Sequence, residues 1–217
     1  MMLLERARAE LVRTCRRAVD ERLVVGTAGN FSVRVGDLVA VTPSGLDYHA
    51  LTPDLVGVHD LDGTPVEAPL RPTSELPMHL AVYRATAASA IVHTHSPAAA
   101  ALSCVVRELP AVHYYIALLG GRVLVAPYAP FGTDELAANL VTALGDRAAC
   151  LLANHGAVTV GADLEQAYQR AGHLEWISEV ALRVLGTGQP AALLTLEQIS
   201  IAADSFATYG QSAPDQL

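Results

Sequence analysis

Three histidines in this sequence have the spacing of a metal site. His93 and His95 stand two residues apart after an apolar pair, and His155 follows the apolar run 150–153. Side chains two residues apart on a strand point to the same face, so two imidazoles there can bind one ion. A catalytic zinc centre needs three protein ligands and an open position, which predicts one site from these histidines. Core or surface imidazoles without a metal are the alternative, and His79, on a helix face, is expected to be a core or interface histidine.

A carboxylate and several small polar turns could complete this site. Glu75 follows Thr73 and Ser74 at the start of a predicted helix, where free N–H groups and the helix dipole favour an anion. The Gly-Asn turn at 29–30 and the Ser-Gly turn at 44–45 could lend further N–H groups to the same anion. Beside a metal, a glutamate can be a ligand or a general base. Ordinary turn and cap chemistry, with a surface glutamate, is the other interpretation.

Paired strands, with helices between and around them, must position these residues. Periodicity predicts a helix starting after 96, another starting at 195, and helices over 3–23, 74–85, 133–144 and 163–185. Strand patterns predict strands over 31–35, 38–42, 90–95, 122–126, 149–153 and 157–160. The first two of these flank a turn and form a predicted hairpin, and a second hairpin is predicted around 60–63. Ser74 is the expected cap of its helix, and Thr195 with Gln198 forms a capping box. This order favours paired antiparallel strands surrounded by helices over a parallel sheet.

The charge composition excludes several kinds of function. The sequence has no lysine: all 14 cationic side chains are arginine, against 22 aspartates and glutamates, for a net charge of −8. Enzymes that use a lysine Schiff base, including imine-forming aldolases, are therefore excluded, and so are ordinary P-loop proteins. We expect no nucleic-acid partner for so acidic a chain. The G-x-x-G at 26–29 is not a dinucleotide-binding fingerprint.

We expect one domain spanning 1–217, with a flexible polar tail over 211–217. At 52% apolar and 17% charged residues, the chain can bury a sizeable core. No run of 18 apolar residues predicts a membrane span, and charged residues from position 5 onward interrupt any signal-peptide pattern. Cys15, Cys104 and Cys150 form no C-x-x-C pair, which indicates free thiols in a cytoplasmic protein.

The chain resembles the class II aldolase/adducin family nearly from end to end. The resemblance rests on ordered blocks at 26–34, 42–45, 73–75, 92–95, 113–114, 120–121, 126–133, 155–156 and 208–210. It implies a single three-layer α/β/α domain with a central, largely antiparallel sheet. Ser44 and Thr73 stand where Thr and Ser are expected, and both keep a hydroxyl group. The segment 115–119 is bulkier than expected for the branch that acts on L-fuculose 1-phosphate, which this chain resembles most.

The resemblance also implies a role for each candidate residue. A Zn²⁺ ion, or Mn²⁺ or Co²⁺, would be held by His93, His95, His155 and Glu75. A phosphate would be bound by Gly29, Asn30, Ser44, Gly45, Thr73 and Ser74. The catalytic acid/base residues would be Glu75 and, from a neighbouring subunit, Tyr114, and the substrate pocket would be shaped by Phe131 and Tyr209. The implied assembly is a cyclic homotetramer with active sites at subunit interfaces.

The implied reaction is cleavage of a (deoxy)ketose 1-phosphate, such as L-fuculose 1-phosphate, to dihydroxyacetone phosphate and a short aldehyde. A metal ion would stabilise the charge left on the triose half, where other aldolases use a lysine iminium. A sugar-phosphate dehydratase and a decarboxylase on the same scaffold remain open, whereas a 4-epimerase is expected to have Asp at the place of Glu75. A non-catalytic adducin-like binding module predicts lost metal ligands, and all four are present. Arg71, two residues before Thr73, could help to bind phosphate.

Overall fold

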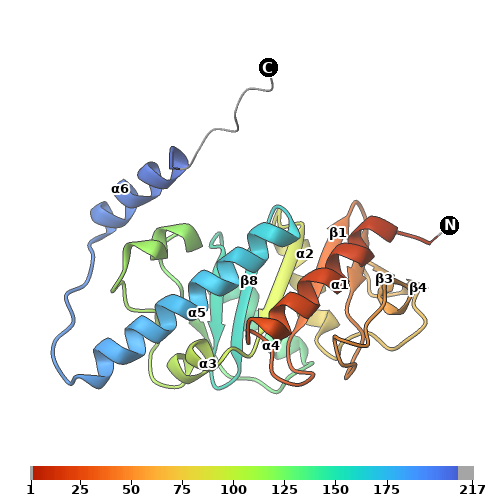
Figure 1. Cartoon of the computed structure of the whole chain (residues 1–217), viewed down its shortest axis with the longest axis horizontal. Helices are drawn as coiled ribbons and strands as arrows, with labels where there is room; N and C mark the ends of the chain where they lie inside the picture. The colour runs from red at the N-terminus through yellow and green to blue at the C-terminus, as the bar shows by residue number, and fades with distance from the viewer. Residues whose placement is uncertain (1, 210–217) are drawn as a thin grey trace.

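A single mixed sheet runs through the structure, a computed structural model that describes residues 2–209 (Figure 1). The predicted tail at 211–217 lies outside these residues. The strands are β1 (Asn30–Val35), β2 (Leu38–Val41), β3 (Gly57–Asp60), β4 (Pro65–Glu67), β5 (Ala90–Thr94), β6 (Val125–Ala126), β7 (Ala149–Leu152) and β8 (Gly156–Gly161). Their order is β4-β3-β2-β1-β5-β8-β7-β6, and every neighbouring pair is antiparallel except β6 with β7. The predicted largely antiparallel sheet is confirmed.

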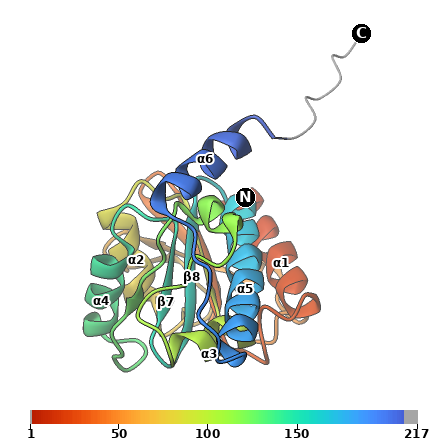
Figure 2. The same cartoon turned by 90° about the vertical axis from the view of Figure 1, so that its left-hand side faces the viewer.

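Helices cover both faces of this sheet (Figure 2). One face packs against α2 (Leu76–Ala85) and α4 (Asp134–Leu144), and the other against α1 (Glu5–Asp20), α3 (Pro97–Ser103) and α5 (Leu164–Gly186). Strand alternation separates the two cores: on β5, Ile91 joins the α2–α4 core, whereas Ala90 and Val92 join the α1–α5 core. The fold is therefore the predicted three-layer α/β/α arrangement, and His93 belongs to the same strand face as Ile91.

Two local predictions near the site need correction. Strand β6 covers only Val125–Ala126 and not 122–126, and it pairs with β7 in parallel. Helix α2 begins at Leu76, because Glu75 takes the N-cap position and makes no side-chain cap bond. Ser74 is therefore not the cap; the Thr73 hydroxyl instead accepts a hydrogen bond from the Glu75 N–H at 3.2 Å. This arrangement leaves the Glu75 side chain available to the site.

The C-terminal part lies apart from the three layers. Helix α6 (Leu196–Ala207) has the predicted capping box between Thr195 and Gln198, and it packs on the 3₁₀ helix η2 (Tyr114–Leu119) (Figure 1). Sequence patterns did not predict η2; a further 3₁₀ turn, η1, covers Pro53–Leu55. Within residues 2–209, none of the helices combines the length and apolar character required to cross a bilayer.

Candidate metal centre

Strand pairing brings the three predicted histidines together. His93 is the fourth residue of β5, and His95 follows the strand end on the same face. His155 lies in the turn between β7 and β8, and β8 pairs with β5 so that Ala157 lies opposite Thr94. The turn that carries His155 therefore lies beside the end of β5. Register, and not sequence proximity, sets this meeting point.

Two glycines allow the backbones at this point to approach closely. A Cβ atom on Gly156 would stand 2.2 Å from the Thr94 carbonyl oxygen, and one on Gly29 would stand 2.7 Å from the His93 carbonyl oxygen. Real Cβ atoms do not approach so closely, so β5 is held between neighbours that have no side chain there. Gly29 also has a φ of +90°, which favours glycine. The Gly-Asn and His-Gly pairs thus have a structural role in placing the ligands.

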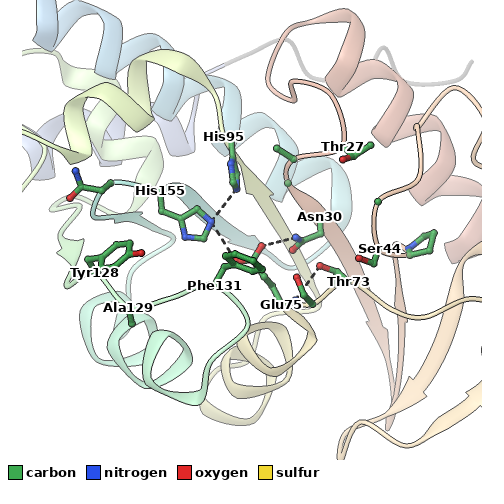
Figure 3. Close-up of a pocket in the computed structure, with 16 residues that line it drawn as sticks. Thr27, Asn30, Ser44, Thr73, Glu75, His95, Tyr128, Ala129, Phe131 and His155 are labelled. Carbon is green, nitrogen blue, oxygen red and sulfur yellow. Dashed lines mark hydrogen bonds and ion pairs between the residues drawn. The ribbon is translucent and has the colours of Figure 1, made fainter.

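The four predicted ligands converge on one point. Nε2 of His95 lies 3.0 Å from Nε2 of His93 and 3.1 Å from Nε2 of His155. The Glu75 carboxylate places Oε2 3.1 Å from His93 Nε2. Its Oε1 lies 3.4 Å from His155 Nε2, the contact that Figure 3 shows. One ligand atom from each residue lies within 4.8 Å of all the others. Four ligands at about 2.0–2.1 Å from a tetrahedral zinc stand roughly 3.3 Å apart, so these separations fit one ion.

The donor chemistry also fits a divalent cation. His93 donates its Nδ1–H to the Ala157 carbonyl at 2.9 Å, which turns Nε2 toward the cluster. Glu75 Oε1 is buried and has no hydrogen-bond partner among the described residues. A buried, unsatisfied carboxylate oxygen is costly unless a charge or donor meets it. Three imidazole nitrogens and one carboxylate form a ligand set that suits zinc and related divalent ions.

Electrostatics within the cluster point the same way. Burial raises the pKa of Glu75, but the charge of His93 and the hydrogen bonds from His93 and Asn30 outweigh it and hold that pKa well below its usual value. Burial lowers the pKa of His93, yet the charge and hydrogen bond of Glu75 give a net upward shift. Burial, followed by the charge of His93, lowers the pKa of both His95 and His155 to about 4. The cluster thus combines an ionised carboxylate with two neutral imidazoles that can act as ligands.

A pocket of about 360 Å³ opens over this cluster (Figure 3). Its lining includes the six residues predicted to bind phosphate, which are Gly29, Asn30, Ser44, Gly45, Thr73 and Ser74. Glu75, His95, His155 and the predicted substrate-pocket residue Phe131 line it as well. His93 is fully buried behind them. A set of small turns and a metal-ligand cluster therefore share one pocket, as an anionic substrate with a reacting carbon centre would require.

Sequence patterns gave no role to six other lining residues, of which Thr27, Tyr128 and Asn154 have polar side chains. Thr27 and Tyr128 lie within the blocks at 26–34 and 126–133, and Asn154 precedes His155. Their closeness in the sequence to predicted site residues is the signal that could have identified them. Arg71 has an exposed side chain, and among the described residues no arginine lines this pocket.

Two predicted residues lie elsewhere in the chain. Tyr114, at the start of η2, and Tyr209, after α6, line a separate hollow together with Tyr115 and Phe206. The rings of Tyr114 and Phe206 stack at 5.7 Å, and the Tyr209 ring meets Phe206 edge-on at 6.3 Å. In the described part of one chain, neither tyrosine lines the pocket of Glu75.

Known proteins are similar to this chain in sequence and in architecture. The sequence pattern of the Class II Aldolase and Adducin N-terminal domain matches residues 9–182. The chain is 39% identical to a 5-deoxy-D-ribulose 1-phosphate aldolase of Bacillus thuringiensis serovar kurstaki, over 97% of this chain and 100% of that protein. It is 37% identical to the L-fuculose phosphate aldolase of Escherichia coli strain K12, over 93% of this chain and 94% of that protein.

A solved structure of an L-fuculose 1-phosphate aldolase superposes with a TM-score of 0.91 at 35% identity, covering 95% of this chain and 98% of the other. The match thus extends over nearly the whole of both chains. Sequence pattern, relatives and architecture agree, and the chain belongs to the class II aldolase and adducin family.

Proposed function

We propose that this chain, a class II aldolase with an intact metal-ligand cluster, cleaves a deoxyketose 1-phosphate to dihydroxyacetone phosphate and a short aldehyde. The observation that supports this most is the shared pocket, in which Glu75 and three histidines face a set of turns rich in N–H and hydroxyl groups. The histidine cluster suits the reacting oxygens, and the turns suit the phosphate. The phosphate and the reacting oxygens of one small phosphorylated sugar are thereby accommodated.

Zn²⁺ is the proposed ion, with Mn²⁺ or Co²⁺ as substitutes that the same donors accept. Held by His93, His95, His155 and Glu75, it would supply Lewis-acid stabilisation of the negative charge that develops on the triose half. Glu75 would be a metal ligand in the substrate-free site and would act as acid/base once the substrate displaces it; its Oε1, 3.4 Å from His155 Nε2, has no hydrogen-bond partner among the described residues. Tyr114 from a neighbouring subunit of a homotetramer is the second proton carrier in this proposal.

The phosphate would be bound without a lysine. Thr73, Ser74 and Ser44 offer hydroxyl groups, and the turns at 29–30 and 44–45 offer backbone N–H groups at the pocket wall. No arginine lines the pocket among the described residues, so neutral donors and the metal's field would carry the binding. This design disfavours assistance from Arg71, whose side chain is exposed.

The sugars named for the two relatives indicate a class of substrate. One relative is named for 5-deoxy-D-ribulose 1-phosphate and the other for L-fuculose phosphate, and both sugars end in a methyl group. Phe131 lines the pocket with a largely exposed ring, which offers an apolar contact for such an end. We therefore propose a deoxyketose 1-phosphate and not a fully hydroxylated sugar.

Product analysis tests this proposal. The protein, supplied with Zn²⁺, is incubated with L-fuculose 1-phosphate, 5-deoxyribulose 1-phosphate and a matched hydroxylated ketose 1-phosphate, and the products are identified by mass spectrometry. Release of dihydroxyacetone phosphate from at least one deoxy sugar is expected, and the Glu75→Gln variant serves as the inactive control. Loss of water from one of these sugars without triose release would instead identify a dehydratase, and loss of carbon dioxide from a phosphorylated tetronate tested alongside would identify a decarboxylase. No reaction with any phosphorylated sugar would favour the adducin-like binding module.

A further inference from the structure

A row of buried polar side chains continues from Glu75 into the core between α2 and the sheet. Glu75 precedes α2, and His79 and Tyr83 follow it at intervals of four residues, so all three lie along one side of that helix. Asn30 and Ser32 stand two residues apart on β1 and face the helix. Each of these five residues is at most 5% exposed. The row therefore runs from the floor of the pocket, at Glu75 and Asn30, into the interior of the protein.

Consecutive members of the row are hydrogen-bonded. Tyr83 Oη lies 2.7 Å from Ser32 Oγ, which lies 2.6 Å from His79 Nδ1. His79 Nε2 lies 2.5 Å from Asn30 Oδ1, and Asn30 Nδ2 lies 2.8 Å from Glu75 Oε2. Every polar side-chain atom of Tyr83, Ser32, His79 and Asn30 is engaged, and the path ends at the carboxylate that contacts His93 and His155.

The direction of each hydrogen bond follows from the last one. The ionised Glu75 carboxylate can only accept, so the Asn30 amide donates from Nδ2 and its Oδ1 must accept. His79 therefore carries its hydrogen on Nε2 and accepts at Nδ1 from the Ser32 hydroxyl. Ser32 in turn accepts from Tyr83. Burial, followed by the charge of His93, lowers the pKa of His79 to about 3, which agrees with this neutral tautomer.

Packing alone does not require such a row. Replacing a buried hydrogen-bonded set by apolar side chains of similar shape is often nearly neutral for stability. An amide without a fixed partner, in contrast, can rotate by 180° and exchange its donor and acceptor. Rotation of Asn30 would turn Oδ1 toward the Glu75 carboxylate, and the two acceptors would repel each other.

We propose that His79, held by Ser32 and Tyr83, is a positioning residue that fixes the orientation of the Asn30 amide and thereby holds the Glu75 carboxylate against His93 and His155. Asn30 also lines the pocket, so the same orientation presents its second Nδ2–H to a bound ligand. Through Asn30, the row thus connects the metal-ligand cluster to the turns that are proposed to bind phosphate. This inference rests on the proposed metal site, since positioning Glu75 matters there only if Glu75 serves a metal ion.

The test is a double-mutant cycle read out by metal affinity. Zn²⁺ dissociation constants are measured by competition with a chromophoric chelator for the parent, His79→Phe, Asn30→Ala and the double variant. We expect His79→Phe to weaken Zn²⁺ binding by about 10–100-fold, the size of effect seen for groups that orient metal ligands. In the Asn30→Ala background the same change should have little further effect, because His79 acts through Asn30. The visible spectrum of the Co²⁺-substituted protein should change in the single variant as well.

Two further variants keep the test decisive. Ser32→Ala removes the group that holds His79 Nδ1, and it replaces His79→Phe in the cycle should that variant not fold. His59→Phe is the matched control: His59 is also a buried histidine, but it lies on β3, and its substitution should leave Zn²⁺ affinity unchanged.

Three results would overturn the inference. The positioning role alone would be contradicted if the His79→Phe and Ser32→Ala variants both bound Zn²⁺ as tightly as the parent. It would also be contradicted if His79→Phe weakened Zn²⁺ binding as much in the Asn30→Ala background as in the parent. A parent protein that binds neither Zn²⁺ nor Co²⁺ would overturn the metal site itself, and the positioning role with it.

Discussion

The metal-ligand cluster and the surface around η2 and α6 differ in whether one chain supplies all the residues that the proposed site needs. In the cluster, Glu75 is 4% exposed and His93 is fully buried, and their partners come from the same chain. On the η2–α6 surface, formed by Tyr114, Tyr115, Ile201, Phe206 and Tyr209, the Tyr209 side chain is 83% exposed. Exposed apolar patches of this kind mark interaction sites. One half of the proposed active site is therefore complete within a chain, and we propose that a neighbouring subunit supplies the other half.

The largest effect should come from breaking the complete half. His95→Ala removes one ligand at the centre of the cluster, so metal binding should be lost and turnover should fall by about 10³-fold or more. Metal content by elemental analysis and triose release from a ketose 1-phosphate measure the two effects. An active, metal-containing variant would show that the ion is held elsewhere.

A smaller but specific loss should come from the incomplete half. Tyr114→Phe removes one proposed proton carrier, and kcat should fall by about 10²–10⁴-fold while bound zinc stays unchanged. Measuring both kcat and metal content distinguishes the loss of a proton carrier from the loss of the metal site.

Mixing two inactive chains sharpens the same comparison. If Glu75 and Tyr114 meet across an interface, hybrids of Glu75→Gln and Tyr114→Phe chains contain sites with both native residues and should regain activity. Either variant refolded alone is the control. Hybrids no more active than their parents would contradict the shared site.

Backbone approach beside β5 should be measurable as stability. Gly156→Ala places a methyl group against the Thr94 carbonyl, so we expect the free energy of unfolding to fall by about 1–3 kcal/mol and Zn²⁺ affinity to weaken. Gly172→Ala is the matched control: Gly172 lies within α5 with open space around its Cβ position, and alanine there should stabilise the helix by about 0.5–1 kcal/mol. Chemical denaturation of both variants measures the difference, and equal effects would refute the role given to Gly156.

The smallest effect on chain stability should follow from a change on α6. Ile201 is 59% exposed, so Ile201→Asp should change the free energy of unfolding by no more than about 0.5 kcal/mol. If this surface joins subunits, the same variant should have a lower mass in solution by light scattering. An unchanged mass would indicate that α6 lies outside the interface.

Local patterns predicted those parts of the site that depend on short-range geometry. The strand period of two is enough to place His93 and His95 on one face, and both lie there. The position of His155 needed more, because only the pairing of β8 with β5 brings the turn before Gly156 to the strand end. Spacing predicted a metal site from the three histidines, and the resemblance assigned Glu75 as its fourth ligand.

Other features depended on tertiary contacts that no sequence pattern encodes. His79 was expected to be a core histidine, and it is buried, but its bond to Asn30 is visible only once β1 and α2 are packed together. The Ser74 cap was wrong because Glu75 occupies the N-cap itself, next to the histidine cluster. Helix η2 was missed because the run Tyr114–Leu119 is apolar throughout and has no clear helical or strand period.

The most direct test of the central claim is metal reconstitution. The protein is stripped with a chelator, dialysed, and titrated with Zn²⁺ while triose release from a deoxyketose 1-phosphate is followed. We predict that stripped protein is inactive and that activity rises linearly to a plateau at one ion per chain, with His95→Ala inactive throughout. Full activity in the stripped protein, or activity that never depends on added metal, would contradict the account.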